Sequence, residues 1–310
     1  MPMTSRSATF KDIEACLALQ PTNRGDGAAG VVEALALWEF LVQQPFFLSA
    51  VLEADPSIRG HRLVGFGSAI LVSSEFMEAE VANPRPNVTA RIVADWSALA
   101  SRKEVARMNA GEGIEVVILH SVWRDNILSA SEKRELQTLL VFGLAEVLAG
   151  FRLRRILCET TSRATTDFHR RSVEYRVVAE FSEGEHAIYL MTRDSATAMP
   201  GSIGNVIYRR FKPVLHLRES DQRLLLAALR VSTDLDLAFD LGLSCAAVKA
   251  RWRSIFARIA ETMPDLMEQS DAHEGRGAQK RHRVLAYVRA HPEELRPYDW
   301  RGEPKNRSGC

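Results

Sequence analysis

Residues 114–120 read IEVVILH, a short apolar run that predicts a buried β-strand. The segment Ser131–Leu148 repeats its apolar residues at helical spacing, and Ser131 is a suitable N-cap for that helix. A second strand is predicted over Arg155–Glu159, followed by a short helix over Thr161–Arg171. This alternation of strands and helices indicates an α/β layer.

The segments on either side extend that layer. Tyr175–Phe181 and His186–Met191 predict a hairpin that turns at Ser182–Glu185, where Gly184 suits the turn. Upstream, Arg62–Val72 alternates apolar residues in the manner of a strand. The expected fold class of the N-terminal region is therefore α/β (α+β) with a mixed sheet.

Composition places few limits on function. Of the 310 residues, 46% are apolar and 25% are charged, as in an ordinary soluble globular protein. This length allows one large domain and one small one. The formal net charge is only +1, so any signal for nucleic-acid binding must be local.

A segment rich in Ser, Ala, Gly and Pro divides the chain near residue 200. We therefore predict a ligand-sensing or dimerisation α/β domain over residues 1–193 and a linker over residues 194–212. An all-α domain is predicted over residues 213–268, and a basic tail with a short helix over residues 269–310.

Three helices are predicted in the all-α domain. The first covers Asp221–Leu229, and the second covers Asp234–Leu241, with Ser232 or Thr233 as its cap. Gly242 can supply the left-handed turn that ends the second helix, and Ser244 then caps the third. The third helix carries an apolar stripe made of Val248, Trp252, Ile255, Phe256 and Ile259.

This region resembles the LuxR-type helix-turn-helix over Leu217–Ile259, without a gap in spacing. The matching positions include Leu241-Gly242-Leu243-Ser244, Val248–Lys249 and Ile255–Phe256, whereas Ala247 departs from the family pattern. The resemblance implies that the third helix enters the major groove of double-stranded DNA. The residues expected to contact DNA are Ser244, Cys245, Ala246, Lys249, Ala250, Arg251, Arg253 and Arg258.

The order of elements over Ala8–Met191 resembles the GNAT acetyltransferase fold. In that family a glycine-rich turn after the central strand holds the pyrophosphate of acetyl-CoA. Here Ser121–Ser131 (SVWRDNILSAS) contains no glycine, and Glu174–Tyr175 stands where the family often has Gly-Phe. We therefore expect a GNAT-like domain that is catalytically degenerate.

No other chemistry is indicated. The spaced glycines Gly25, Gly27 and Gly30 fit a dinucleotide fingerprint, but no strand precedes them, so a loop is expected. The four cysteines lack the paired spacing of a zinc site. Glu115 and Glu159 lie on predicted strands, where we expect them to face solvent.

The sequence thus predicts a DNA-binding transcriptional regulator rather than an enzyme, with no catalytic residue, no cofactor and no metal. It would bind double-stranded DNA as a homodimer, and its N-terminal domain would bind an unknown small-molecule ligand or mediate dimerisation. With neither a signal peptide nor an apolar run of membrane-spanning length, we expect a cytoplasmic protein without membrane contact. The alternative is an acetyl-CoA-dependent N-acyltransferase with an appended helical interaction module.

Overall fold

The computed structural model describes residues 3–19, 38–44, 46–54, 62–124, 126–172, 174–198, 202–209, 212–231, 233–268 and 276–301. The chain forms two compact units. The first contains nearly all of residues 1–209, and the second contains residues 210–310 together with two short segments, 109–111 and 149–152. None of the helices within these described ranges combines the length and the apolar character needed to cross a membrane.

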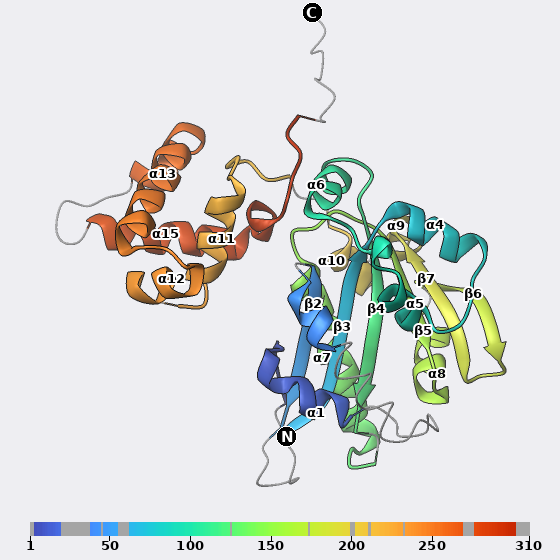
Figure 1. Cartoon of the computed structure of the whole chain (residues 1–310). Helices are drawn as coiled ribbons and strands as arrows, with labels where there is room; N and C mark the ends of the chain where they lie inside the picture. Colours follow the sequence, from blue (N-terminus) through green and yellow to red (C-terminus); the bar gives the residue numbers. More distant parts are fainter. Residues whose placement is uncertain are drawn as a thin grey trace, which may run out of the picture. The chain divides into compact units, whose positions relative to one another are not determined.

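The first unit is built on one mixed sheet of seven strands in the order β1-β2-β3-β4-β5-β7-β6 (Figure 1). Only β4 and β5 pair in parallel, and every other neighbouring pair is antiparallel. The strands are β1 (Thr4–Ser7), β2 (Phe47–Glu53), β3 (Leu63–Val72), β4 (Ile114–Trp123), β5 (Leu153–Thr160), β6 (Tyr175–Ser182) and β7 (His186–Thr192).

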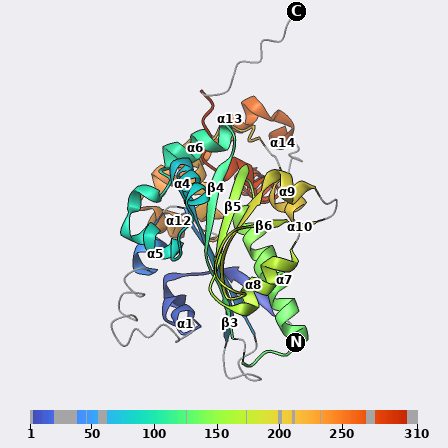
Figure 2. The same cartoon turned by 90° about the vertical axis from the view of Figure 1, so that its right-hand side faces the viewer.

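Helices cover both faces of this sheet (Figure 2). One face carries α1 (Ile13–Leu17), α4 (Ser74–Ala82) and α5 (Val88–Ala94). The other face carries α7 (Ala130–Leu148) and α8 (Arg163–Arg171), and α7 is the crossover that makes the β4–β5 pair parallel. Buried apolar clusters fill the space on each side of the sheet. The remaining helices of this unit are α6 (Arg102–Ala110), α9 (Arg193–Thr197), α10 (Ile203–Ile207) and the short 3-10 turns at Phe10–Asp12 and Trp96–Ala98.

The predicted strand–helix alternation is confirmed, with one change at the start of α7. The helix begins at Ala130 rather than Ser131, and its N-cap is Ser129. Ser129 and Glu132 form a capping box, in which the Ser129 hydroxyl accepts from the Glu132 backbone N–H and the Glu132 carboxylate accepts from the Ser129 N–H at 2.9 Å. The helix therefore starts after Ser129, which has a capping partner in Glu132, and not after Ser131.

The segment that we predicted as a linker over residues 194–212 contains α9 and α10 and belongs to the first unit up to residue 209. Thr192 and Ser195 cap α9 reciprocally. Tyr208 is buried, and its hydroxyl donates to the Met191 carbonyl oxygen at 2.9 Å. Small residues in this segment therefore act as caps, and one aromatic side chain anchors it to β7.

The second unit is helical. Its helices are α11 (Glu219–Ala228), α12 (Asp234–Leu241), α13 (Cys245–Thr262), α14 (Pro264–Glu268) and α15 (Arg276–Ala290), with a 3-10 turn at Pro292–Leu295. Gly242 ends α12 with φ of 62°, and Ser244 caps α13 by accepting from the Ala247 N–H. The predicted stripe of α13 packs inward, with Val248, Trp252, Ile255 and Ile259 buried and Phe256 half-buried.

Candidate active site

The central strands β4 and β5 separate before either of them ends. Their last residue pair is Ile118 with Cys158, whereas β4 continues to Trp123. A β-bulge lies at this point, because Ser68 of β3 pairs with His120 while the next residue, Ala69, pairs with Ile118. A bulge bends the strand that carries it. The bulge in β4 therefore explains why the strand leaves β5 there.

The bulge also decides which way His120 points. Because Leu119 is the extra residue, His120 stays on the sheet face opposite α7, where its ring lies 5.0 Å from that of Trp38 and 5.9 Å from that of Phe66. Its Nδ1 lies 2.8 Å from the Ser68 hydroxyl. One imidazole is thus held by a hydrogen bond at the point where the two strands part.

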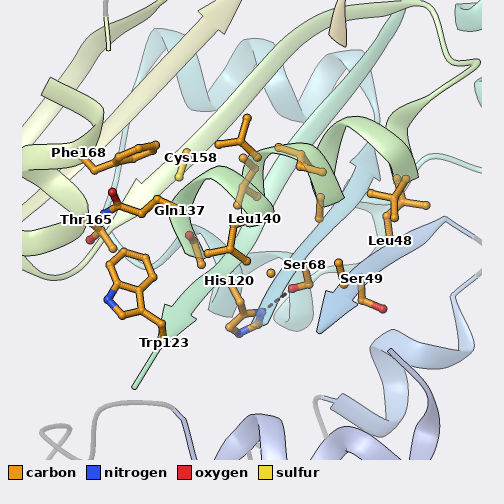
Figure 3. A pocket seen from close by; sticks show the side chains of 18 of the residues that line it. Leu48, Ser49, Ser68, His120, Trp123, Gln137, Leu140, Cys158, Thr165 and Phe168 are labelled. Atoms are coloured by element: carbon orange, nitrogen blue, oxygen red, sulfur yellow. Dashed lines mark hydrogen bonds between the residues drawn. The ribbon is translucent and has the colours of Figure 1, made fainter. Parts of the chain in front are cut away.

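A cavity of about 70 Å³ occupies the separation between the strands and the space under α7 (Figure 3). Leu140 lies in its middle, Thr165 and Phe168 lie at one end, and Leu48 and Ser49 lie at the other. The cavity is lined by Leu48, Ser49, Ala50, Gly67, Ser68, Ala69, Ile118, His120, Ser121, Trp123, Gln137, Leu140, Val141, Leu144, Val147, Cys158, Thr165, Phe168, His169 and Tyr175.

Burial keeps three titratable groups of this lining uncharged at neutral pH. It raises the pKa of the Cys158 thiol to about 12. It lowers the pKa of His169, although a hydrogen bond to the Thr165 carbonyl opposes the shift, and it raises the pKa of Tyr175 well above its usual value. A thiol with so high a pKa is a poor nucleophile.

His169 has a defined tautomer. Its Nδ1 lies 2.8 Å from the carbonyl oxygen of Thr165, which can only accept, so Nδ1 carries the proton. The ring packs against Tyr175 and Tyr189, with centroid distances of 4.8 Å and 5.3 Å. His169 is therefore a neutral, buried part of the wall formed by α8.

The start of α7 does not fit a diphosphate. Backbone N–H groups at a helix N-terminus can bind phosphate, but here the Glu132 carboxylate lies at that end. It accepts from the Ser129 N–H at 2.9 Å and from the Ser129 hydroxyl at 2.7 Å. The segment before α7 thus lacks a glycine-rich turn, and the helix start carries a negative charge that would repel a diphosphate.

The two strand acids that we expected to face solvent are bound by other residues of the unit instead. Glu115 is fully buried and bound by Arg155, whose Nη2 lies 2.7 Å from Oε1. The Glu159 carboxylate lies 2.6 Å from His186 Nε2 and accepts from the backbone N–H groups of Asn87 and Val88. Neither acid lines the cavity.

The residues expected to contact DNA lie on or next to α13 in the second unit. Lys249, Ala250 and Arg253 are exposed, as are Ser244 and Ala246, whereas Cys245 is half-buried. Two of the cations are engaged within the unit. Arg251 donates to the Ser220 carbonyl oxygen at 3.2 Å, and Arg258 donates to that of His216 at 3.3 Å.

Sequence reasoning missed the residues that line the cavity. His120 ends the apolar run 114–120, and a histidine at the end of such a run is a signal that could have identified it. No group of three or more residues that could hold a metal occurs in the described part of the chain. The dinucleotide-like glycines at positions 25, 27 and 30 lie outside the described residues.

No protein-family model matches the chain, and no curated protein sequence matches it. Solved structures do match. Spermidine/spermine N-acetyltransferase SpeG from Vibrio cholerae is 11% identical, with a TM-score of 0.34 over 62% of this chain and 93% of that one. FeeM, an N-acyl amino acid synthase from uncultured soil microbes, is 12% identical, with a TM-score of 0.36 over 64% of this chain and 96% of that one.

A third match, an uncharacterized protein from Bacillus halodurans, is 10% identical, with a TM-score of 0.38 over 67% of this chain and 92% of that one. At these identities and TM-scores the likeness concerns the fold alone. The first unit has a GNAT-like α/β fold, as its mixed seven-stranded sheet with helices on both faces indicates.

These findings correct the functional prediction. Two of the matches are named as acyltransferases, and no comparison supports a DNA-binding regulator, so we withdraw the expectation of a non-enzymatic, DNA-binding transcriptional regulator. Nothing in the comparisons supports the LuxR-type resemblance of Leu217–Ile259. The error has a physical source. A missing glycine turn removes one way to hold a diphosphate, but it does not close the separation between β4 and β5.

Proposed function

We propose that this chain is an N-acyltransferase, which moves an acyl group from a thioester to an amine. The observation that carries the proposal is the separation of β4 from β5 after the Ile118–Cys158 pair, with a cavity in the resulting space. Beyond that pair, the edge of β4 that faces β5 no longer forms strand pairs, although the Leu119 carbonyl oxygen accepts from Thr89 Oγ1 at 3.5 Å. An extended thioester arm can pair with such an edge as an added strand does.

His120 is the base in this proposal. In the tautomer in which Nδ1–H donates to Ser68, Nε2 can accept a proton from the attacking amine. The amine nitrogen attacks the thioester carbonyl carbon, so that a C–N bond forms and the C–S bond breaks. The sulfur leaves as a thiolate, and the proton taken from the amine ends on the thiol. An ordinary thiol has a pKa of about 8.5, so this leaving group needs no dedicated acid.

Transfer is direct, without an acyl-enzyme. Among the described residues that line the cavity, Cys158 is the one thiol, and burial raises its pKa to about 12, so it remains protonated at neutral pH. The diphosphate end of a coenzyme A donor has no place at the start of α7, because Glu132 occupies it. The acyl group and the thioester arm therefore provide the binding energy for the donor.

The test is transfer by the full chain. Acetyl, butyryl and octanoyl thioesters are incubated with spermidine or with an α-amino acid, the amine classes suggested by the names of two structural matches. Mass spectrometry measures the amide, and a thiol reagent measures the released thiol. We expect an amide product with wild type and about 100-fold less with His120→Gln. Absence of amide for every pair would overturn the proposal.

The helical unit is an appended interaction module in this proposal. On α12, Leu235 and Phe239 lie one turn apart and are 71% and 88% exposed. Two copies of such an apolar pair can cover each other about a twofold axis. We expect sedimentation to detect a dimer of the wild type. The double change Leu235→Ser with Phe239→Ser should weaken the dimer affinity at least tenfold. The control Asp240→Ser, an exposed change on the same helix, should leave the dimer intact. A monomeric wild type would contradict this role.

A further inference from the structure

We infer that the acyl group handled by this site is an unbranched chain of medium length, buried between α7 and the sheet, rather than acetyl. This inference rests on the proposed function. It is carried by the shape and the chemistry of the part of the cavity that extends beyond His120.

The first support is the length of the cavity along α7. Gln137, Leu140, Val141, Leu144 and Val147 all line it and recur at helical spacing on one side of that helix. From the first to the last of these residues the helix rises by about 15 Å. An acetyl group would occupy only a small part of this length.

The second support is the opposite wall, which the strands provide. Ala50 of β2 and Gly67 and Ala69 of β3 place little or no side chain under α7. The wall is nevertheless close to the helix, since a Cβ at position 67 would lie 3.2 Å from Leu140 Cδ2. Gly67 therefore already contacts Leu140, so the cavity is confined at this point, and a confined space admits a single acyl chain more readily than a bulky ring system.

The third support is the absence of charge. The residues that line the cavity in the described part of the chain include no Lys, Arg, Asp or Glu. Burial also keeps Cys158, His169 and Tyr175 neutral near pH 7. A carboxylated acyl group such as succinyl would lose its hydration here without gaining a partner. A saturated chain pays no such penalty, and each methylene buried adds to its binding.

The experiment measures kcat/KM of the full chain for acetyl, butyryl, octanoyl and dodecanoyl thioesters of pantetheine, with one amine acceptor at fixed concentration. We expect kcat/KM to rise about fourfold per added methylene until the chain fills the cavity. A succinyl thioester should be poorer than the butyryl thioester by at least tenfold. Highest activity with acetyl would overturn the inference.

A variant that blocks part of the cavity tests where the acyl chain lies. Leu144→Trp fills the far part of the cavity and should lower the octanoyl-to-acetyl ratio of kcat/KM at least tenfold. The matched control is Leu139→Trp, on the same helix and half-buried but outside the lining, which should leave the ratio unchanged. Should Leu144→Trp fail to fold, Leu144→Ala provides the opposite test, because the longer cavity should shift the optimum toward dodecanoyl. An unchanged ratio in the folded variant would contradict the inference.

Failure of this inference and failure of the proposed function have different signatures. Efficient acetyl transfer with no gain from longer chains would disprove the acyl cavity and leave the acyltransferase intact. No transfer from any donor would disprove the function. In that case calorimetry with dodecanoyl pantetheine tests the cavity by itself. Binding that Leu144→Trp removes would support an acyl chain in the cavity, and absence of binding would disprove the acyl cavity.

Discussion

At the scale of single residues, two histidines line the same cavity but have different surroundings. His120 lies at the separation of the strands, with Nδ1 2.8 Å from the Ser68 hydroxyl. His169 is 5% exposed and lies on α8 among aromatic rings. We propose His120 rather than His169 as the base because His120 lies where the strands separate, whereas the His169 ring is enclosed by Tyr175 and Tyr189.

This assignment predicts a clear difference between two variants. His120→Gln should lower kcat for acyl transfer about 100-fold, because a general base contributes that much or more. His169→Gln should lower kcat less than tenfold. Steady-state kinetics with the octanoyl donor provides the measurement, and circular dichroism verifies that both variants fold. A larger loss in His169→Gln would assign the base to α8 instead.

Cys158 shows how burial determines reactivity. Its pKa of about 12 leaves almost no thiolate at pH 7. We expect Cys158→Ala to retain transfer activity within about threefold, and mass spectrometry of enzyme stopped during turnover to find no added acyl group. A covalent acyl adduct on Cys158 would contradict direct transfer.

At the scale of elements, α7 both covers the cavity and limits the donor. Its capping box places the Glu132 carboxylate at the helix start, where a diphosphate would otherwise bind. The same helix supplies the apolar stripe of the cavity. For the proposed transfer, α7 would thus favour the acyl end of a donor over its nucleotide end.

The donor preference follows from this charge. Octanoyl pantetheine, which has no diphosphate, should be used with a KM within about threefold of that for octanoyl coenzyme A. Glu132→Gln should lower the KM for the coenzyme A donor alone, because removal of a carboxylate at a helix N-terminus strengthens anion binding. Equal changes for both donors would show that Glu132 does not act on the diphosphate.

At the scale of the whole molecule, each unit has its own buried core. The helical unit packs around Leu224, Val248 and Trp252. The α/β unit packs on both faces of its sheet. The cavity and its titratable residues belong to the α/β unit, so ligand binding and acid should act on the stability of that unit.

Acid should destabilise the α/β unit in a window set by His169. Burial lowers the pKa of His169 below its ordinary 6.5, so the unfolded chain takes up a proton at a pH where the folded chain does not. The stability contributed by the neutral imidazole is therefore present above about pH 6.5 and is lost as the pH falls toward the lowered value. Urea unfolding between pH 7.5 and about 5 measures this slope, and His169→Phe should flatten it. An equal slope in the variant would place the proton uptake elsewhere.

Much of the fold was determined locally and could be predicted from the sequence. The apolar run at residues 114–120, the hairpin turn at Gly184 and the helix end at Gly242 each depend on short-range rules, and each is present in the structure. The strands β1 and β2 were missed. β1 pairs with β2 across a long stretch of chain, as in Thr4 with Glu53, and β2 lies between β1 and β3, so the placement of both strands depends on tertiary contacts.

Residues 114–120 also show which features depend on the tertiary structure. The run IEVVILH predicts a buried strand, because it is short and apolar and four of its seven residues are β-branched Ile or Val. Only the tertiary structure decided that β4 bulges at Leu119 and leaves β5. Strand register and bulges are set by neighbouring strands rather than by the strand's own composition. For that reason the cavity, on which the proposed acyltransferase function rests, could not be predicted from the sequence.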